Sequence, residues 1–384
     1  MKKLIRITTV PISLEKLLEN QARFFKSYYE VTLVSAQIDE LEALAKDQGV
    51  AFFPLEMTRK ITPLQDLRCL IQLIRFLRQE KPHIVHSHTP KAGIIGMLAA
   101  FIARVPVRMH TVAGLPLMEA KGLKRILLNL VERITYFCAT HIYSNSKGLE
   151  AFILQNKLCP PQKMKILGEG SSNGIDTTYF DPKQVSKVQQ YDLKKELQIK
   201  AKDFVFCFVG RLVKDKGINE LIEAFIAISK KNSAAKLLLV GHAEAELDPL
   251  LPQTLHSIGL NENIIEVGFQ NDIRPYLAIA DVFTFPSYRE GFPNVILQAN
   301  AMEIPCIVSN INGCNEIINE GENGWIIPAK NTLMLQKKME AVLKSPIALK
   351  FTKNEIRTHI INKYERKVFW NLLLQEYKTL EKDV

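Results

Sequence analysis

Two short motifs place charged side chains between a strand pattern and a predicted helix. The first runs from Gly210 to Gly217 and carries the cations Arg211 and Lys216 ahead of a predicted helix over residues 219–228. The start of a helix presents unpaired N–H groups and a partial positive charge, which favour phosphate. Glycine permits the tight turn and the close backbone approach that such a site needs. The motif therefore predicts a diphosphate site, with a solvated basic loop as the alternative.

The second motif covers residues 287–294 and leads into a predicted helix over residues 294–302. Its carboxylate, Glu290, would repel phosphate, so it is better suited to accept hydrogen bonds from sugar hydroxyls. The N–H groups at the start of the helix, near Val295, could hold phosphate oxygens. Gln298 lies one turn further on. The alternative is an acidic residue that the helix dipole favours at this position.

Other strand ends indicate chemistry less specifically. His86 and His88 would face the same side of an extended chain, but no third ligand stands at a supporting spacing, so no metal site is predicted. Polar residues also follow the predicted strand over residues 107–112. The loop over residues 168–174 contains a G-x-G, yet no helix pattern follows it, so it does not meet the dinucleotide fingerprint. Phosphate-binding P-loops and G-x-S-x-G elbows are not found in the sequence.

The strands and helices that must position these motifs alternate along both halves of the chain. Strand patterns separated by helices of 10–20 residues predict parallel sheets. We expect an α/β protein with two doubly wound, Rossmann-like domains that face each other across a cleft. The predicted domains cover residues 1–182 and 200–355, with a polar linker near residues 181–202. A helix over residues 356–384 is expected to cross back and pack on the first domain.

Composition sets further bounds. The chain has 384 residues, of which 47% are apolar and 23% charged, as in an ordinary globular protein of two to three domains. Six cysteines without a C-x-x-C pair indicate a reduced, cytoplasmic protein. The longest apolar run, residues 92–103, is too short to cross a bilayer. The N-terminus has the pattern of a first strand rather than a signal peptide.

The net charge of +10 is unevenly distributed. Residues 1–190 hold 26 Lys and Arg against 16 Asp and Glu, whereas the remaining residues hold 24 of each. This asymmetry predicts an anionic partner for the first half, with a general compositional preference for lysine as the alternative. A nucleic-acid partner is not expected, because no stripe interleaves aromatic residues with the cations.

One predicted helix suggests what that partner is. Residues 121–133 place Lys121, Lys124, Arg125 and Arg133 beside a face of leucine and isoleucine. Such a helix could lie on an anionic membrane surface. The alternative is a packed helix whose basic face points to solvent.

The motifs over residues 210–217 and 287–294 resemble those of retaining glycosyltransferases of the GT-B fold, family 4. Four segments of the first half share this resemblance: TTVPISLEKLL, HSHTPKAGIIG, HTVAGLPL and GEGSSNGID. The resemblance covers nearly the whole chain and points to the branch that assembles bacterial capsule, O-antigen and lipid-linked glycans. It implies that Arg211 and Lys216 bind the donor diphosphate and that Glu290 contacts the donor sugar, so these three would be the catalytic residues. The donor-binding residues implied are Gly210, Arg211, Lys216, Glu290, Gly291, Phe292, Asn294, Val295 and Gln298.

Two positions depart from the family pattern. Gln298 stands where the second acidic residue of the E-x7-E pattern would contact the ribose, and Ala113 stands where many relatives carry a histidine. The nearest histidine is His110. The residues expected at an acceptor or sugar site are His88, Lys91, His110, Gly114 and Asn173.

The resemblance also implies the reaction. It predicts a hexosyl- or N-acetylhexosaminyltransferase that uses a nucleotide-sugar, expected to be a UDP-sugar, and needs neither a metal nor another cofactor. The acceptor would be a glycan or a polyprenyl-diphosphate-linked sugar at the inner face of the cytoplasmic membrane. The alternative is another two-domain sugar-nucleotide enzyme, such as a UDP-sugar 2-epimerase. That class expects clustered acidic and histidine residues, which the pattern from Glu290 to Gln298 does not provide.

Overall fold

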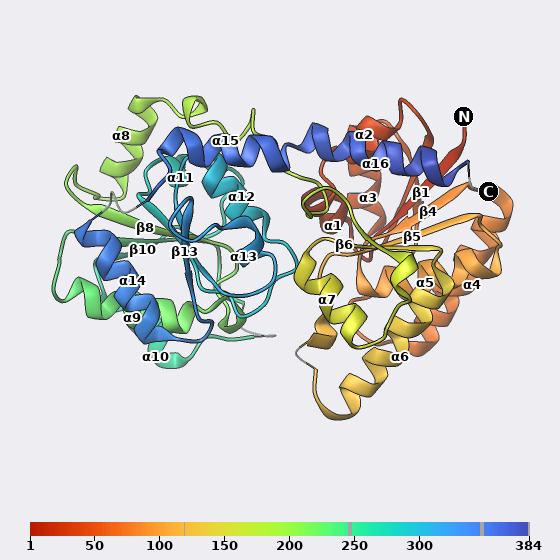
Figure 1. Ribbon diagram of the computed structural model, residues 1–384, viewed down its shortest axis with the longest axis horizontal. Helices are drawn as coiled ribbons and strands as arrows, with labels where there is room; N and C mark the ends of the chain where they lie inside the picture. The colour runs from red at the N-terminus through yellow and green to blue at the C-terminus, as the bar shows by residue number, and fades with distance from the viewer. Residues whose placement is uncertain (119, 245–247, 346–348, 383–384) are drawn as a thin grey trace. The chain divides into compact units, whose positions relative to one another are not determined.

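The chain forms two α/β units, each built on one parallel sheet (Figure 1). The computed structural model describes residues 1–118, 120–244, 248–345 and 349–382. The first unit comprises Met1–Gly174 together with Arg366–Val384, and the second comprises Ile175–Glu365. The predicted architecture of two doubly wound domains is therefore confirmed.

Seven parallel strands form the sheet of the first unit, in the order β3-β2-β1-β4-β5-β6-β7. Their order reverses between β1 and β4, and ligands of doubly wound sheets bind beyond the strand ends at such a point. Arg6 in β1 lies between Leu33 of β2 and His86 of β4. The strands are β1 (Lys3–Ile7), β2 (Glu30–Ser35), β3 (Ala51–Pro54), β4 (Ile84–Ser87), β5 (Val107–Val112), β6 (His141–Ser144) and β7 (Met164–Ile166).

Helices cover both faces of this sheet and bury two separate apolar layers (Figure 1). On one face lie α4 (Pro63–Glu80), α5 (Pro90–Ile102), α6 (Gly122–Cys138) and α7 (Lys147–Gln155). On the other lie α1 (Pro11–Leu17), α2 (Gln21–Phe25), α3 (Ile38–Gln48) and α16 (Arg366–Leu380). Helices α1 and α2 are separate, because Asn20 between them adopts a left-handed conformation with φ of 60°.

Six parallel strands form the sheet of the second unit, in the order β10-β9-β8-β11-β12-β13. Its central strand β8, FVFCFV, is apolar almost throughout, as expected for a strand covered on both faces. The strands are β8 (Phe204–Val209), β9 (Ala235–Val240), β10 (Ile264–Glu266), β11 (Val282–Phe285), β12 (Cys306–Ser309) and β13 (Gly324–Ile327). The helices are α8 (Lys187–Glu196), α9 (Ile218–Ser229), α10 (Pro252–Leu260), α11 (Arg274–Ala278), α12 (Asn294–Ala301), α13 (Cys314–Ile317), α14 (Thr332–Lys344) and α15 (Lys353–Tyr364).

The boundary between the units differs from the predicted one. It lies between Gly174 and Ile175 rather than at residue 182, and residues 181–202 belong to the second unit and contain α8. Arg357 ties the start of this segment to the second unit, because it donates to the carbonyl oxygens of Thr177 and Phe180 at 2.6 and 2.5 Å. It also pairs with Asp181 at 3.1 Å. The segment is therefore not a free linker.

The C-terminal helix returns to the first unit as predicted, but it begins later than expected. Residues 353–364 form α15 of the second unit, and α16 starts only at Arg366. Trp370 of α16 donates its indole N–H to Asn173 at 2.6 Å, and the Tyr377 hydroxyl lies 2.7 Å from His86 Nδ1. These contacts anchor α16 in the first unit. The predicted end of the helix, residues 383–384, lies outside the described residues.

The hydropathy of the helices shows whether any of them could span a membrane. Within the ranges described above, no helix is both long and apolar enough to cross a bilayer.

Candidate functional site

The first predicted motif forms a tight loop at the carboxyl end of β8. Gly210 and Gly217 have φ of 148° and 72°, values that suit glycine. A Cβ atom on Gly217 would collide with the carbonyl oxygen of Pro286, so the loop can lie against the end of β11 only with glycine here. Lys216 lies in the single 3-10 turn over residues 214–216 that precedes α9. The fold thus brings the first motif onto the second.

Lys216 and Glu290 form an ion pair with both side chains largely buried, at 17% and 14% exposure. The Ser287 hydroxyl donates to the same carboxylate oxygen at 2.9 Å. The Lys216 ammonium also lies 5.4 Å from the centre of the Phe285 ring, close enough for a cation–π interaction. The predicted phosphate-binding cation and the predicted sugar-binding carboxylate are therefore in direct contact, although 74 residues separate them in the sequence.

Arg211 is half exposed and pairs with Glu244, which follows β9. Sequence reasoning did not identify Glu244. Only the order of the strands indicates that Glu244 lies near Arg211, because β8 and β9 are neighbours and the loops that follow them lie side by side. A ligand anion at Arg211 has to compete with this carboxylate.

Polar side chains hold the loop of the second motif in place. Arg289 donates from Nη2 and Nε to Asp215 Oδ2 at 2.9 and 3.1 Å. The Tyr288 amide donates to the Asp215 carbonyl oxygen at 2.8 Å. Asn312 donates its side-chain amide to the Glu290 carbonyl oxygen. These bonds fix the position of Glu290, and sequence reasoning assigned roles to neither Asp215 nor Asn312.

The helix after this loop, α12, begins at Asn294 without a side-chain cap. Its first N–H groups, including that of Val295, are therefore not used by a capping side chain. The buried Phe292 ring packs against Tyr364, with ring centres 5.6 Å apart. Gly291 lies against Gly313, and a Cβ atom on Gly313 would collide with the Gly291 carbonyl oxygen. The side-chain oxygen of Gln298 is buried and has no hydrogen-bond partner in the part of the chain that the structure describes. Phe292 is one of the predicted donor-binding residues, but its buried ring packs against Tyr364 within the second unit.

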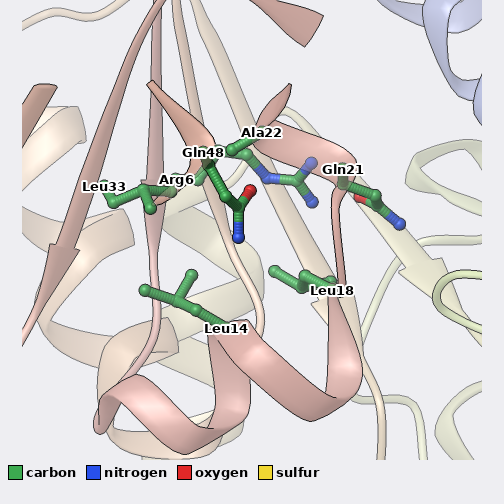
Figure 2. A pocket seen from close by; sticks show the side chains of 7 residues that line it. All are labelled: Arg6, Leu14, Leu18, Gln21, Ala22, Leu33 and Gln48. Atoms are coloured by element: carbon green, nitrogen blue, oxygen red, sulfur yellow. The ribbon is translucent and has the colours of Figure 1, made fainter. Parts of the chain in front are cut away.

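In the first unit, His88 contacts the fully buried Arg6. Arg6 Nη2 lies 2.9 Å from His88 Nε2, and because a guanidinium only donates, Nε2 accepts and the His88 proton resides on Nδ1. Burial, with His86 and Arg6 nearby, holds the pKa of His88 well below its usual range. Figure 2 shows the Arg6 side chain at a small cavity, which is also lined by Leu14, Leu18, Gln21, Ala22, Leu33 and Gln48.

The other residues expected near an acceptor are mostly engaged within the unit. His110 is buried, its Nδ1 lies 2.8 Å from the Ser87 hydroxyl, and burial lowers its pKa to about 4. Lys91 pairs with Asp66 at 2.5 Å. Asn173 accepts from the side chains of Gln21 and Trp370. Gly114 has open space where a Cβ would stand. His110 therefore stays neutral at neutral pH.

His86 and His88 do face the same side, and their rings lie 4.0 Å apart. Both ring nitrogens of His86 are used, by Tyr377 and by Thr111, each at 2.7 Å. Outside the masked positions, no group of three or more His, Cys, Asp or Glu is arranged to hold a metal ion.

Helix α6 exposes several large apolar side chains. Leu123, Ile126 and Phe137 are exposed by 84%, 66% and 69%. Leu127, Leu130 and Ile134 are also exposed on this helix. The opposite face packs inward through Glu132, Thr135 and Tyr136. The solvent face of α6 therefore carries leucine and isoleucine side chains as well as the predicted cations.

Two doubly wound units, each built on one parallel sheet, are typical of the GT-B fold. The fold agrees with the crystal structure of Anabaena Alr3699/HepE in complex with UDP, with a TM-score of 0.81, 18% identity, and coverage of 99% of this chain and 100% of that one. Sucrose-phosphate synthase of Thermosynechococcus elongatus gives a TM-score of 0.80 at 16% identity, over 100% of both chains.

The sequence comparisons give the family. Residues 14–170 match the glycosyl transferase 4-like domain, and residues 189–365 match glycosyl transferases group 1. A capsular polysaccharide biosynthesis glycosyltransferase of Staphylococcus aureus is 34% identical over 383 residues, 100% of this chain and 98% of that protein. UDP-Gal:alpha-D-GlcNAc-diphosphoundecaprenol alpha-1,3-galactosyltransferase of Escherichia coli is 31% identical, covering 78% of this chain and 76% of that protein. The chain belongs to the group 1 glycosyltransferase family.

Proposed function

We propose that this glycosyltransferase moves a hexosyl or N-acetylhexosaminyl group from a UDP-sugar to a polyprenyl-diphosphate-linked or glycan acceptor during bacterial surface polysaccharide synthesis. The contact between Lys216 and Glu290, beside the loop of Arg211, carries the proposal. It brings a phosphate-binding cation and a sugar-binding carboxylate to one place, as a nucleotide-sugar requires. The names of the relatives support the choice of substrates, because one uses UDP-Gal and a diphosphoundecaprenol-linked acceptor.

In the proposed reaction, the bond between the sugar and the diphosphate breaks, and negative charge develops on the leaving UDP. Arg211 and Lys216 stabilise this charge where it forms. Each charge-assisted hydrogen bond contributes about 1.5–3 kcal/mol. Because these cations supply the positive charge, the proposed reaction needs no metal. The acceptor hydroxyl attacks from the face that the diphosphate leaves, so the sugar retains its anomeric configuration.

The second unit, residues 175–365, is proposed to bind the donor and the first to bind the acceptor. A lipid-linked acceptor lies at a membrane, and α6 gives the first unit a surface suited to one. The exposed apolar face of α6 stands beside the exposed cations Lys121, Lys124 and Arg133. Helices with this pattern lie in the interface of anionic bilayers. We therefore place the enzyme at the inner face of the cytoplasmic membrane as a peripheral protein.

The test of the donor site is a pair of lysine variants. We expect Lys216→Ala to retain the fold and to lower turnover of the UDP-sugar at least about tenfold, the value of one charge-assisted hydrogen bond. Lys214→Ala is the matched control, because Lys214 is exposed in the same 3-10 turn, and its turnover should equal that of the wild type. A thermal-shift screen with UDP, GDP and ADP identifies the nucleotide beforehand.

Unchanged turnover in Lys216→Ala would refute the proposed site. Product analysis separates the two enzyme classes weighed above, because an epimerase would convert the UDP-sugar without an acceptor, whereas a transferase releases UDP as the acceptor is glycosylated.

A further inference from the structure

A small cavity in the first unit lies between β1, β2 and the helices α1, α2 and α3 (Figure 2). Its volume is about 10 Å³, which is room for one guest of the size of a water molecule. The seven residues that line it are each exposed by 3% or less. All of them belong to the first unit. The cavity is therefore an internal feature of that unit, and it does not depend on the donor site proposed above.

Arg6 brings a positive charge into the wall of this cavity. Its side chain is fully buried, and a guanidinium cannot be deprotonated in a protein, so the charge is permanent. Nη2 donates to His88, whereas the N–H groups on Nε and Nη1 have no hydrogen-bond partner among the described residues. The Phe25 ring, 5.5 Å from the guanidinium carbon, offers only the attraction of its π-face. Two donor groups of a buried cation are thus left for a guest.

The titratable side chains around Arg6 supply no negative charge at neutral pH. Of the described side chains, Tyr377 is the one whose ionised form would offset the charge of Arg6, and burial raises the pKa of Tyr377 to about 12. Burial also holds the pKa values of His86 and His88 well below their usual range, so both rings are neutral. A buried charge without a counterion is costly to the folded state. The surroundings of Arg6 therefore favour a guest that carries a negative charge.

Two glutamine side chains complete the polar part of the wall. The Gln48 side-chain oxygen accepts from the Arg23 amide at 3.3 Å, and Figure 2 shows the amide nitrogen of Gln48 pointing into the space beside Arg6. The Gln21 amide nitrogen donates to residues 172–173 at 2.7 Å, which leaves its oxygen without a partner among the described residues. One carbonyl dipole opposes an anion, but the full charge of the guanidinium outweighs it.

We propose that this cavity binds a single monatomic anion, a halide such as chloride. The anion accepts hydrogen bonds from Arg6 Nε and Nη1 and from the Gln48 amide. Leu14 and Leu18 close the rest of the wall, so an anion as large as sulfate or gluconate does not fit. The bound halide neutralises Arg6 and ties α1, α2 and the end of α3 to β1. It is thus a structural ligand of the first unit, with no part in the transfer reaction.

Thermal melting of the full chain in sodium chloride and in sodium gluconate, at one ionic strength, tests the proposal. Chloride at ten times its dissociation constant multiplies the ratio of folded to unfolded molecules about 11-fold, which raises the melting temperature of a unit of this size by about 3–6 °C. The rise should saturate with chloride, and sulfate should not reproduce it. Amide hydrogen exchange should slow in β1 and α2 and stay unchanged in the second unit.

Three variants separate the site from general effects of salt. Arg6→Met replaces the cation with an apolar side chain of similar length, so the unit should fold and its melting temperature should no longer depend on chloride. Gln48→Leu removes one donor and should weaken chloride binding at least about tenfold. Arg78→Met is the matched control, because Arg78 is exposed on α4 of the same unit, and it should keep the chloride dependence of the wild type.

Crystals grown in sodium bromide locate the anion directly, because bromide scatters anomalously and water does not. We expect an anomalous peak beside Arg6, and a cavity that holds water instead would overturn the proposal. A wild-type melting temperature that does not depend on chloride, or an equal dependence in Arg6→Met, would overturn it too. If Arg6→Met does not fold, Gln48→Leu and the bromide crystals still decide. Activity with a UDP-sugar is a separate measurement, so failure of the halide site leaves the proposed function intact.

Discussion

The proposed binding of α6 to a membrane leads to a quantitative prediction for two of its exposed side chains. Leu123 and Ile126 are exposed by 84% and 66%. Full burial of such a side chain is worth about 1.5–3 kcal/mol, so inserting these two exposed fractions into the interface contributes about 2–4.5 kcal/mol. We therefore expect the double variant Leu123→Ser, Ile126→Ser to bind vesicles about 30- to 2,000-fold more weakly than the wild type. Its thermal stability should be nearly unchanged, because neither side chain is buried in the fold.

A second variant tests the electrostatic part of the same surface. Lys121 and Lys124 are exposed beside the apolar face, and each cation near an anionic surface contributes about 1 kcal/mol. We expect Lys121→Gln, Lys124→Gln to lose binding to phosphatidylglycerol vesicles about 30-fold at low salt, with a smaller loss as salt rises. Binding to neutral phosphatidylcholine vesicles should not change.

Vesicle flotation over a range of lipid concentrations measures both effects. Leu260→Ser is the control, because Leu260 is 70% exposed but lies on α10 of the second unit. Its binding should equal that of the wild type. If the Leu123, Ile126 variant floats with anionic vesicles as well as the wild type does, α6 does not insert and the argument from its exposed face is wrong.

Two further predictions concern single carboxylates. Glu244→Gln removes the charged partner of Arg211. Because an exposed ion pair is worth about 0–1 kcal/mol, the dissociation constant of UDP, measured by calorimetry, should fall by up to about fivefold. Glu262→Gln, at another exposed position, is the control, and an unchanged or raised constant in Glu244→Gln would show that Glu244 does not compete with UDP for Arg211. Burial raises the pKa of Glu132 to about 7, so the folded state favours the protonated acid and loses about 3 kcal/mol as pH rises from the unfolded value near 4.5 to 7. Glu132→Gln should therefore raise the melting temperature at pH 8 far more than at pH 5, and an equal shift at both pH values would contradict this.

The sequence predicted the sheet architecture well, for a clear physical reason. Strands covered on both faces have nearly continuous apolar sequences, and β8 shows this directly in the run Phe204–Val209. Helix α8 was not predicted from the sequence, because it lacks a clear apolar pattern. None of its residues is fully buried, and its sequence is mostly polar and charged, as in a linker. The available signal was local: Ser186 and Gln189 form a capping box that marks the start of a helix.

Some residues of the candidate site could also be located from the sequence, and others could not. The positions of Arg211, Lys216 and Glu290 at strand ends of one sheet could be inferred from the sequence, because each stands near a glycine that follows an apolar strand pattern. Glu244, Asp215 and Asn312 were not, because their partners lie on neighbouring strands or loops that only the fold brings together. Buried Arg6 was equally hidden. One charged residue within a strand pattern does not show whether it faces solvent or, as here, a histidine.

The placement of α16 determines the order in which the two units are completed on the ribosome. The second unit, ending at Glu365, has its whole sequence before the first unit has received Trp370 and Tyr377. The part of the protein that is synthesised first is therefore the last to be finished, and until then its α2 and α3 layer lacks its cover. A message truncated after codon 365 yields a complete second unit joined to a first unit with an open apolar face, which is the kind of surface that chaperones and proteases engage.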